Sequence, residues 1–210
     1  MSENNDLSSF WNGVARRYAA MPVRNQASYE ATLKRINAHL KPTDRVLELG
    51  CGTGATALRL APLVAHYTAT DYAAEMIAIA RERQAEGDVG NVDFVVVDGT
   101  EAALPNAPFD AILAFNVLHL LPDRAKALTD VSRQLRRGGL FISKTPCLGG
   151  IYRVLQPVVA VLRLLGKAPR LAFLTPDRLQ REVTKAGFEI REHGNYPARP
   201  PSRFIVAQKR

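Results

Sequence analysis

The chain has 210 residues, of which 47% are hydrophobic, so it can bury one sizeable core and is expected to form a single domain over residues 1–210. Its polar, acidic first six residues argue against a secretory signal, and no apolar run of about 18 residues could span a membrane. The two cysteines, Cys51 and Cys147, lack metal-ligand spacing, so we expect no metal and a cytoplasmic location.

The net charge of +8 is unevenly distributed along the chain. Residues 1–150 contain 16 basic and 16 acidic side chains, whereas residues 151–210 contain 12 basic and 4 acidic ones. This basic C-terminal part could face nucleic acid, anionic lipid or an acidic substrate, or it could be an ordinary solvated surface.

The N-terminal part predicts one amphipathic helix preceded by aromatic residues. Residues 28–40 place Leu33, Ile36 and Leu40 on one side, and Ser28 is the expected N-cap. Trp11 and Tyr18 come earlier, and one interpretation is that they pack against the edge of a sheet.

A glycine-rich loop follows a predicted buried strand at residues 46–49. The glycines at 50, 52 and 54 give the spacing GxGxG, which lets a backbone turn sharply close to a ligand. The dinucleotide fingerprint is GxGxxG, and Glu48 would repel a phosphate held by this loop. Ala55 and Thr56 stand where a P-loop has its Lys-Ser/Thr pair, so ATP is also disfavoured. The loop is suited to a cationic cofactor.

These residues resemble the first motif of the class I S-adenosylmethionine-dependent methyltransferases, an acidic residue followed by GxGxG. The resemblance covers about residues 46–144 and implies S-adenosyl-L-methionine as cofactor, S-adenosyl-L-homocysteine as product and no metal. It implies an α/β fold with a doubly wound, mainly parallel, Rossmann-like sheet of seven strands, in the order 3-2-1-4-5-7-6 with strand 7 antiparallel. It assigns cofactor contacts in the first motif to Glu48, Gly50, Cys51, Gly52 and Gly54.

The second predicted strand, residues 67–72, ends at Asp71 and Tyr72. A carboxylate there can accept both ribose hydroxyls, so Asp71 is the expected ribose ligand, with Tyr72 beside it. Asp71 could also cap the helix predicted over residues 73–86. Within that helix, Met76 stands where the family packs an apolar side chain on adenine, although a core position explains it equally well.

The third predicted strand, residues 92–97, runs into Asp98, Gly99 and Thr100. The resemblance places an acceptor for the adenine amino group at Asp98, with the next two residues beside it. The alternative is an ordinary Asp-Gly turn.

The fourth predicted strand, residues 109–115, is followed by Asn116, Val117 and His119 at the expected switch point of the sheet. Asn116 and Val117 are therefore expected to contact the cofactor. His119 is the candidate general base, or alternatively a histidine held by packing. A helix is predicted from residue 122 or 123 to 137, stopped by the glycines at 138 and 139, and a fifth strand at 140–144.

Residues 148–174 are predicted to form an amphipathic insertion between the core at 43–147 and a C-terminal helix with the last two strands at 175–210. Pro157 would kink the helix expected at 151–166 or begin a second helical piece. Three interpretations remain open: a lid over an apolar substrate, core packing, and peripheral membrane contact through residues 151–167. By resemblance, residues 1–42 form the other half of a lid, with Tyr18 covering the cofactor.

The motifs favour an enzyme that methylates a small, apolar or aromatic acceptor at O, N or C, resembling the quinone-ring methyltransferases. The alternative is a methyltransferase-fold binding or regulatory module whose basic C-terminal face holds RNA or a protein partner. The motifs that DNA-base methyltransferases carry after the fourth strand, Pro-Cys or Asn/Asp-Pro-Pro-aromatic, are absent. Cys147 follows the fifth strand and is not expected to act as a nucleophile in their place, so nucleic acid is not the expected substrate. We expect a monomer or a homodimer.

Overall fold

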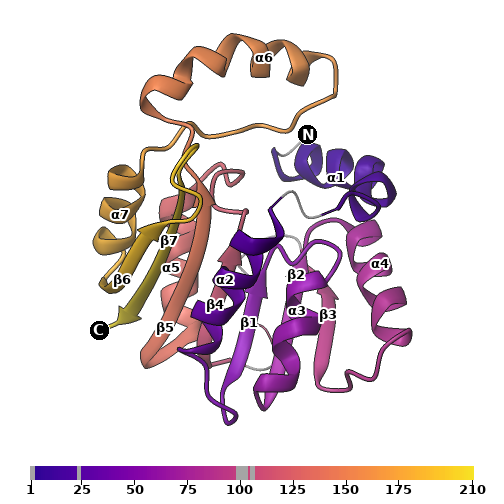
Figure 1. Ribbon diagram of the computed structural model, residues 1–210, viewed down its shortest axis with the longest axis vertical. Coiled ribbons are helices and arrows are strands. Elements are labelled where there is room, and N and C mark those ends of the chain that lie inside the picture. The colour runs from indigo at the N-terminus through magenta and orange to yellow at the C-terminus, as the bar shows by residue number, and fades with distance from the viewer. Residues whose placement is uncertain (1–2, 23–24, 98–103, 105–106) are drawn as a thin grey trace.

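The computed structural model describes residues 3–22, 25–97, 104 and 107–210 (Figure 1). Seven strands form one sheet: β1 (Arg45–Leu49), β2 (His66–Asp71), β3 (Val92–Val96), β4 (Phe109–Phe115), β5 (Leu135–Pro146), β6 (Phe188–Asn195) and β7 (Ser202–Lys209). The helices are α1 (Glu3–Ala19), α2 (Gln26–Asn37), α3 (Ala55–Leu60), α4 (Ala74–Ala85), α5 (Arg124–Gln134), α6 (Gln156–Leu164) and α7 (Pro176–Lys185), with 3-10 turns η1 (Ala61–Leu63) and η2 (Gly150–Leu155).

The strands lie in the order β3-β2-β1-β4-β5-β7-β6, which confirms the predicted fold class. β3, β2, β1, β4 and β5 are parallel, and β7 runs antiparallel to both β5 and β6. Chain order reverses between β1 and β4, where Leu49 pairs with Ala114. The carboxyl ends of these two strands therefore form a crevice where a ligand can bind.

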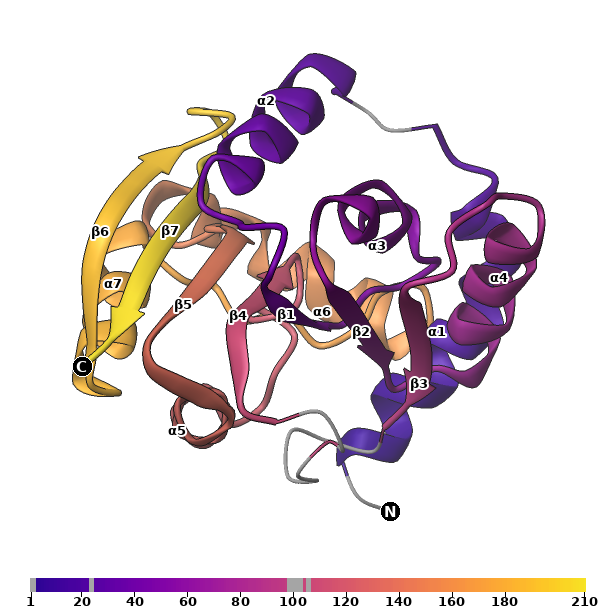
Figure 2. The same cartoon turned by 90° about the horizontal axis from the view of Figure 1, so that it is seen from below.

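Helices cover both faces of the sheet (Figure 2). On one face, Leu128 of α5 and Leu179 of α7 join Leu47 and Phe141 in a fully buried core. On the other face, apolar residues of α2, α3 and α4 pack on the alternate strand positions, such as Val46. Buried parallel strands need apolar residues on both faces, which explains the near-continuous hydrophobic runs in the sequence.

Two predicted helix boundaries are wrong. Helix α2 begins earlier than expected, because the Asn25 side chain accepts from the Ser28 backbone N–H at 2.9 Å and is the N-cap instead of Ser28. Helix α5 ends at Gln134, and Leu135 already pairs with Phe109 of β4. The glycines at 138 and 139 lie within β5, where the register shifts, so they bend a strand and do not stop a helix.

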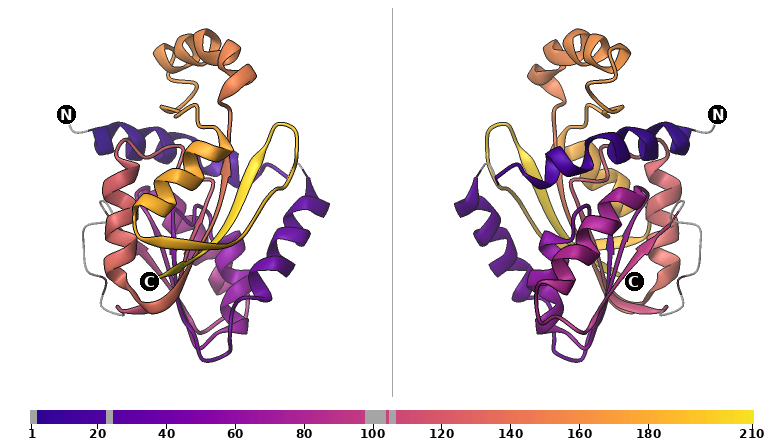
Figure 3. Two further views of the ribbon diagram at one scale, coloured as in Figure 1. Left: turned by 90° about the vertical axis from the view of Figure 1, so that its left-hand side faces the viewer. Right: turned by 90° about the vertical axis from the view of Figure 1, so that its right-hand side faces the viewer.

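The segment between β5 and α7 projects from the carboxyl end of the parallel strands (Figures 1 and 3). It is helical in two pieces, η2 and then α6, with Pro157 in the first turn of α6. Pro157 therefore begins a second helical piece, which was one of the two predicted outcomes. Among the helices of the described residues, none combines the length and apolar character needed to traverse a membrane.

Candidate cofactor site

The glycine loop between β1 and α3 is held in a left-handed conformation at each glycine. Gly50, Gly52 and Gly54 have φ values of 66°, 55° and 75°. A Cβ on Gly54 would lie 2.8 Å from both Ala80 Cβ and Phe94 Cζ, so a side chain there would prevent the loop from packing on α4 and β3. A Cβ on Gly52 would meet no described heavy atom within 4 Å. The loop is thus tightly seated at Gly54 and open at Gly52.

Asp71, at the end of β2, is bound to this loop. Its Oδ2 accepts from the Gly52 N–H at 2.8 Å, and its Oδ1 accepts from the Ala73 N–H at 2.9 Å. Burial raises the pKa of Asp71, and these backbone hydrogen bonds partly offset the effect. An ionised carboxylate has about four acceptor positions, so acceptor capacity stays available for ligand hydroxyls. Asp71 does not cap α4, whose N-cap is Ala73.

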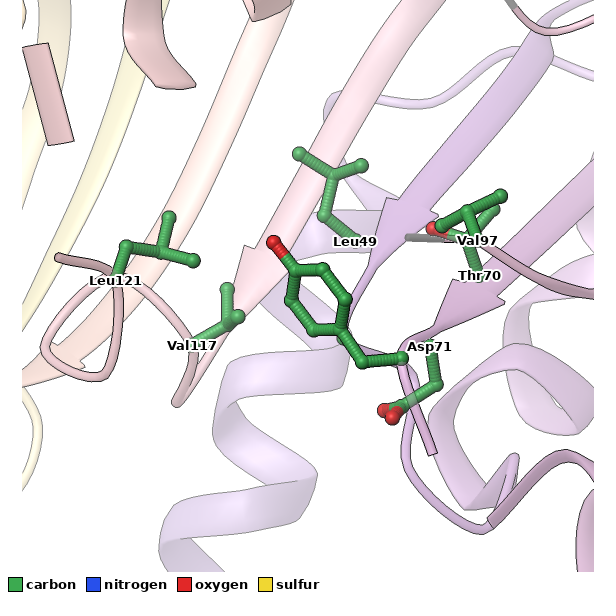
Figure 4. Close-up of a pocket in the computed structure, with 8 residues that line it drawn as sticks. Leu49, Thr70, Asp71, Val97, Val117 and Leu121 are labelled. Carbon is green, nitrogen blue, oxygen red and sulfur yellow. The ribbon is translucent and has the colours of Figure 1, made fainter. Parts of the chain in front are cut away.

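A pocket opens between the ends of β1 and β2 and the loop that follows β4. Figure 4 shows Val117 and Leu121 on one side of it, with Thr70 and Asp71 on the other. Its lining residues are Leu49, Gly50, Thr70, Asp71, Tyr72, Val97, Val117 and Leu121. The lining is mainly apolar with one carboxylate, a combination suited to an organic ligand that carries hydroxyl groups.

The structure does not bring Glu48 into this pocket. Its side chain is 2% exposed and accepts from the Tyr67 hydroxyl at 2.8 Å, on the sheet face opposite Leu49. Burial raises the pKa of Glu48 to about 7, so the carboxyl is partly protonated at neutral pH. Glu48 therefore does not line the pocket, and its expected contact with the cofactor stays a prediction.

Cys51 holds the same loop in position through its backbone. Its backbone N–H donates to the Thr70 carbonyl at 2.9 Å, which joins the loop to the end of β2. The side chain is buried, and burial raises the pKa of its thiol well above the ordinary value. Cys51 thus fixes the loop through its backbone while its thiol stays protonated.

Helix α1 lies beside the end of β2. The Ser8 hydroxyl donates to the Tyr72 carbonyl at 3.2 Å, and Trp11 packs edge-on against Tyr18 with ring centroids 5.7 Å apart. Burial of its ring and the nearby Asp71 carboxylate raise the pKa of Tyr18, although the residue is 46% exposed. Met76 is 2% exposed under α1 and does not line the pocket, in agreement with the core interpretation.

The loop after β4 supplies the opposite wall. The Asn116 N–H donates to the Lys144 carbonyl at 2.8 Å, and its φ of 55° turns the chain so that Val117 reaches Gly50. Asn116 itself is exposed and is not a lining residue of the pocket. His119 lies farther along, and its Nδ1 is buried with no hydrogen-bond partner among the described residues. Burial lowers the pKa of His119 to about 4.

Three predicted residues, Asp98, Gly99 and Thr100, lie outside the described residues. Four lining residues were not singled out from the sequence: Leu49, Thr70, Val97 and Leu121. Leu49, Thr70 and Val97 each stand next to a predicted site residue at a strand end, and that position was the available signal. In the described part of the chain, no group of three or more His, Cys, Asp or Glu side chains could hold a metal ion.

Comparison with known proteins decides the family. Residues 46–139 match the family described as a methyltransferase domain. The ubiquinone biosynthesis O-methyltransferase of Xanthomonas axonopodis is 31% identical over 181 residues, which cover 83% of this chain and 72% of that protein. The chain belongs to the class I S-adenosylmethionine-dependent methyltransferases. This membership confirms the resemblance seen in the glycine loop, and with it the expected cofactor.

Other methyltransferases match over different shares of their length. The 27-O-demethylrifamycin SV methyltransferase of Amycolatopsis mediterranei is 32% identical over 163 residues, which cover 71% of this chain but only 56% of that protein. The chain also spans 7% of a highly reducing polyketide synthase from a Fusarium species. Magnesium protoporphyrin IX methyltransferase from Synechocystis, solved with S-adenosyl-L-homocysteine, matches with a TM-score of 0.76 at 18% identity, covering 100% of both chains. That last likeness concerns the fold.

Proposed function

We propose that this chain transfers a methyl group from S-adenosylmethionine to a small, apolar or aromatic acceptor at O, N or C. The observation that carries the proposal is the pairing of Asp71 with the open Gly52 loop beside an apolar pocket. The names of two relatives, a ubiquinone O-methyltransferase and a rifamycin methyltransferase, support an organic acceptor of this class.

The residues around the pocket fit the cofactor. Asp71 would accept hydrogen bonds from the ribose hydroxyls with its remaining acceptor positions. Gly50 and Gly52 would lie against the methionine moiety of the cofactor. Tyr72 and Val117 would pack on it from two sides, and Tyr18 would cover it from α1. Adenine contacts at Met76 and at 98–100, and a contact at Asn116, stay predictions.

The cap segment, defined as residues 148–174, is placed to cover an acceptor. Its two ends meet, because the Gly149 N–H donates to the Leu174 carbonyl at 2.6 Å. The Ala172 N–H also donates to the His119 carbonyl at 2.8 Å, which ties the base of the segment to the loop lining the pocket. We infer that the cap segment and the N-terminal helices form a lid that selects the acceptor.

Positioning can supply much of the rate. S-adenosylmethionine provides an electrophilic methyl group on a sulfonium, and correct alignment of an acceptor can contribute on the order of 7–11 kcal/mol. A base matters only where the acceptor atom carries a proton. His119 is neutral at physiological pH because burial lowers its pKa to about 4, so its free Nδ1 could accept that proton or orient the acceptor by a hydrogen bond.

Calorimetry with S-adenosyl-L-homocysteine tests the cofactor assignment, and transfer of a labelled methyl group to a panel of quinols, phenols and fatty acids tests the acceptor class. Absence of measurable affinity for both forms of the cofactor would remove the enzyme proposal and leave the binding-module alternative.

The lid requires a separate variant. Replacing residues 151–172 by two glycines keeps the hydrogen-bonded base between Gly149 and Leu174. We expect this variant to bind S-adenosyl-L-homocysteine like the intact chain and to lose most acceptor turnover. Unchanged turnover would show that the cap segment is no lid, and His119→Ala with near-full turnover would exclude His119 from the reaction.

A further inference from the structure

The cap segment displays a dense group of exposed apolar side chains. Ile151, Val154 and Leu164 are 82%, 75% and 87% exposed, and five more large apolar residues are at least 37% exposed: Leu155, Val158, Val161, Leu162 and Leu165. Within the described structure, no residue from 150 to 173 is buried. Such a contiguous apolar surface on a folded domain marks a binding surface.

The charges of this segment all have one sign. Arg153, Arg163 and Lys167 are exposed, and the sequence contains no Asp or Glu between Asp130 and Asp177. On α6, Gln156, Ala160 and Arg163 share one narrow side, while valines and leucines occupy the rest of the circumference. A broad apolar face beside a basic stripe is the pattern of a helix that lies in the headgroup region of a bilayer.

We propose that η2 and α6 dock the protein on an anionic phospholipid bilayer, with the apolar side chains inserted and the basic side chains at the headgroups. A dimer formed through α6 is less favourable, because it would cover the apolar face and leave the basic side chains without a partner of opposite charge. A bilayer with anionic lipid would bury the apolar side chains and also pair the basic side chains with negatively charged headgroups. The helix has 9 residues, which suits a position in the plane of the interface.

The docking surface and the pocket share one end of the molecule. β5 leads directly into η2, and α6 lies beyond the carboxyl ends of the parallel strands, where the pocket opens (Figures 1 and 3). Docking would therefore turn the pocket toward the bilayer. Resting on the proposed methyl transfer, this geometry assigns the acceptor to lipid-soluble compounds that reach the site from the membrane.

Co-sedimentation with vesicles tests the docking. The full chain should bind vesicles of phosphatidylcholine with 30% phosphatidylglycerol much more tightly than pure phosphatidylcholine, and 0.5 M salt should weaken the binding. Leu162→Gln with Leu164→Gln should reduce the affinity at least tenfold. Leu63→Gln is the control for the single variant Leu162→Gln, since Leu63 is 38% exposed, like Leu162 at 37%, but lies in η1 at the other end of the strands.

A second pair of variants tests the charge. Arg163→Gln with Lys167→Gln should lower the affinity for the anionic vesicles by roughly fivefold for each residue. Lys34→Gln with Lys185→Gln removes the same charge from exposed positions on α2 and α7 and should leave binding unchanged.

Three results would overturn the proposal. They are no vesicle binding by the intact chain, equal loss in the control variants, and a homodimer in sedimentation velocity that Leu162→Gln with Leu164→Gln dissociates. Calorimetry with S-adenosyl-L-homocysteine on the same variants separates this proposal from the enzyme proposal. Vesicle binding without cofactor affinity would defeat only the methyl transfer, and cofactor affinity without vesicle binding would defeat only the docking.

Discussion

Replacement of Asp71 by Asn should lower both the stability of the cofactor-free protein and its affinity for the cofactor. The two Asp71 oxygens accept from different N–H groups, those of Gly52 at 2.8 Å and Ala73 at 2.9 Å. An Asn side chain has one acceptor oxygen, so its amino group would face one of these N–H donors. A buried donor left without a partner costs about 1–3 kcal/mol. Loss of the buried charge offsets part of this, so we expect destabilisation in the lower half of that range.

The same replacement removes one charged acceptor from the ribose hydroxyls. Hydrogen bonds to charged groups contribute about 1.5–3 kcal/mol, which corresponds to a loss of about 10- to 150-fold in cofactor affinity. Calorimetric titration with S-adenosyl-L-homocysteine measures the affinity, and urea unfolding measures the stability.

Asp88→Asn is the control, because Asp88 is exposed in the loop before β3, away from the pocket. It should leave both quantities within error of the unmodified protein. If Asp71→Asn bound the ligand within twofold of the unmodified protein, Asp71 would not be the ribose ligand and the reasoning would be refuted.

Three further experiments test the loop and the buried groups. Gly52→Ala should reduce cofactor affinity at least tenfold, because the φ of 55° at Gly52 disfavours a side chain, and that side chain would also face the ligand. Gly166→Ala is the control: Gly166 has a similar φ of 65° but lies outside the pocket, so this variant should keep its cofactor affinity. Burial raises the pKa of Glu48 to about 7, so the folded state holds a proton that the unfolded chain releases near pH 4.5. The free energy of unfolding should therefore fall by about 2–3 kcal/mol between pH 5 and 8, and by less in Glu48→Gln. The His119 ring should titrate near pH 4 by NMR, with stability lost as pH falls from 6.5 toward 4; a midpoint near 6.5 would contradict its burial.

The sequence predicted the sheet well because buried parallel strands carry an unmistakable apolar pattern. Residues 46–49 and 109–115 were predicted as neighbours at the switch point, and β1 pairs with β4. The end of α5 was missed because Leu135 is apolar and suits a helix face as well as a strand. Only its pairing with Phe109 of β4 decides between them.

The site likewise divides into features that the local sequence predicted and features that depend on tertiary contacts. Asp71 and the glycines were singled out because of the local backbone and their place at strand ends, and the structure joins Asp71 to Gly52 by a hydrogen bond. Glu48 was expected to contact the cofactor, and its side chain lies on the sheet face opposite Leu49, as strand alternation requires. The partner that holds it, Tyr67, comes from the neighbouring strand, and that pairing is a tertiary contact.

The amino-acid sequence by itself determined the predicted strands, the cofactor loop and the amphipathic pattern of residues 151–166, because each follows from spacing along the chain, and the resemblance carried by the motifs implied the strand order. Only the tertiary structure decided that this apolar pattern is not part of the core. Burial depends on which elements pack together, and no described residue from 150 to 173 is buried by the rest of the domain. The same apolar face that would have stabilised a core is thereby left at the surface, at the end of the sheet where the pocket opens.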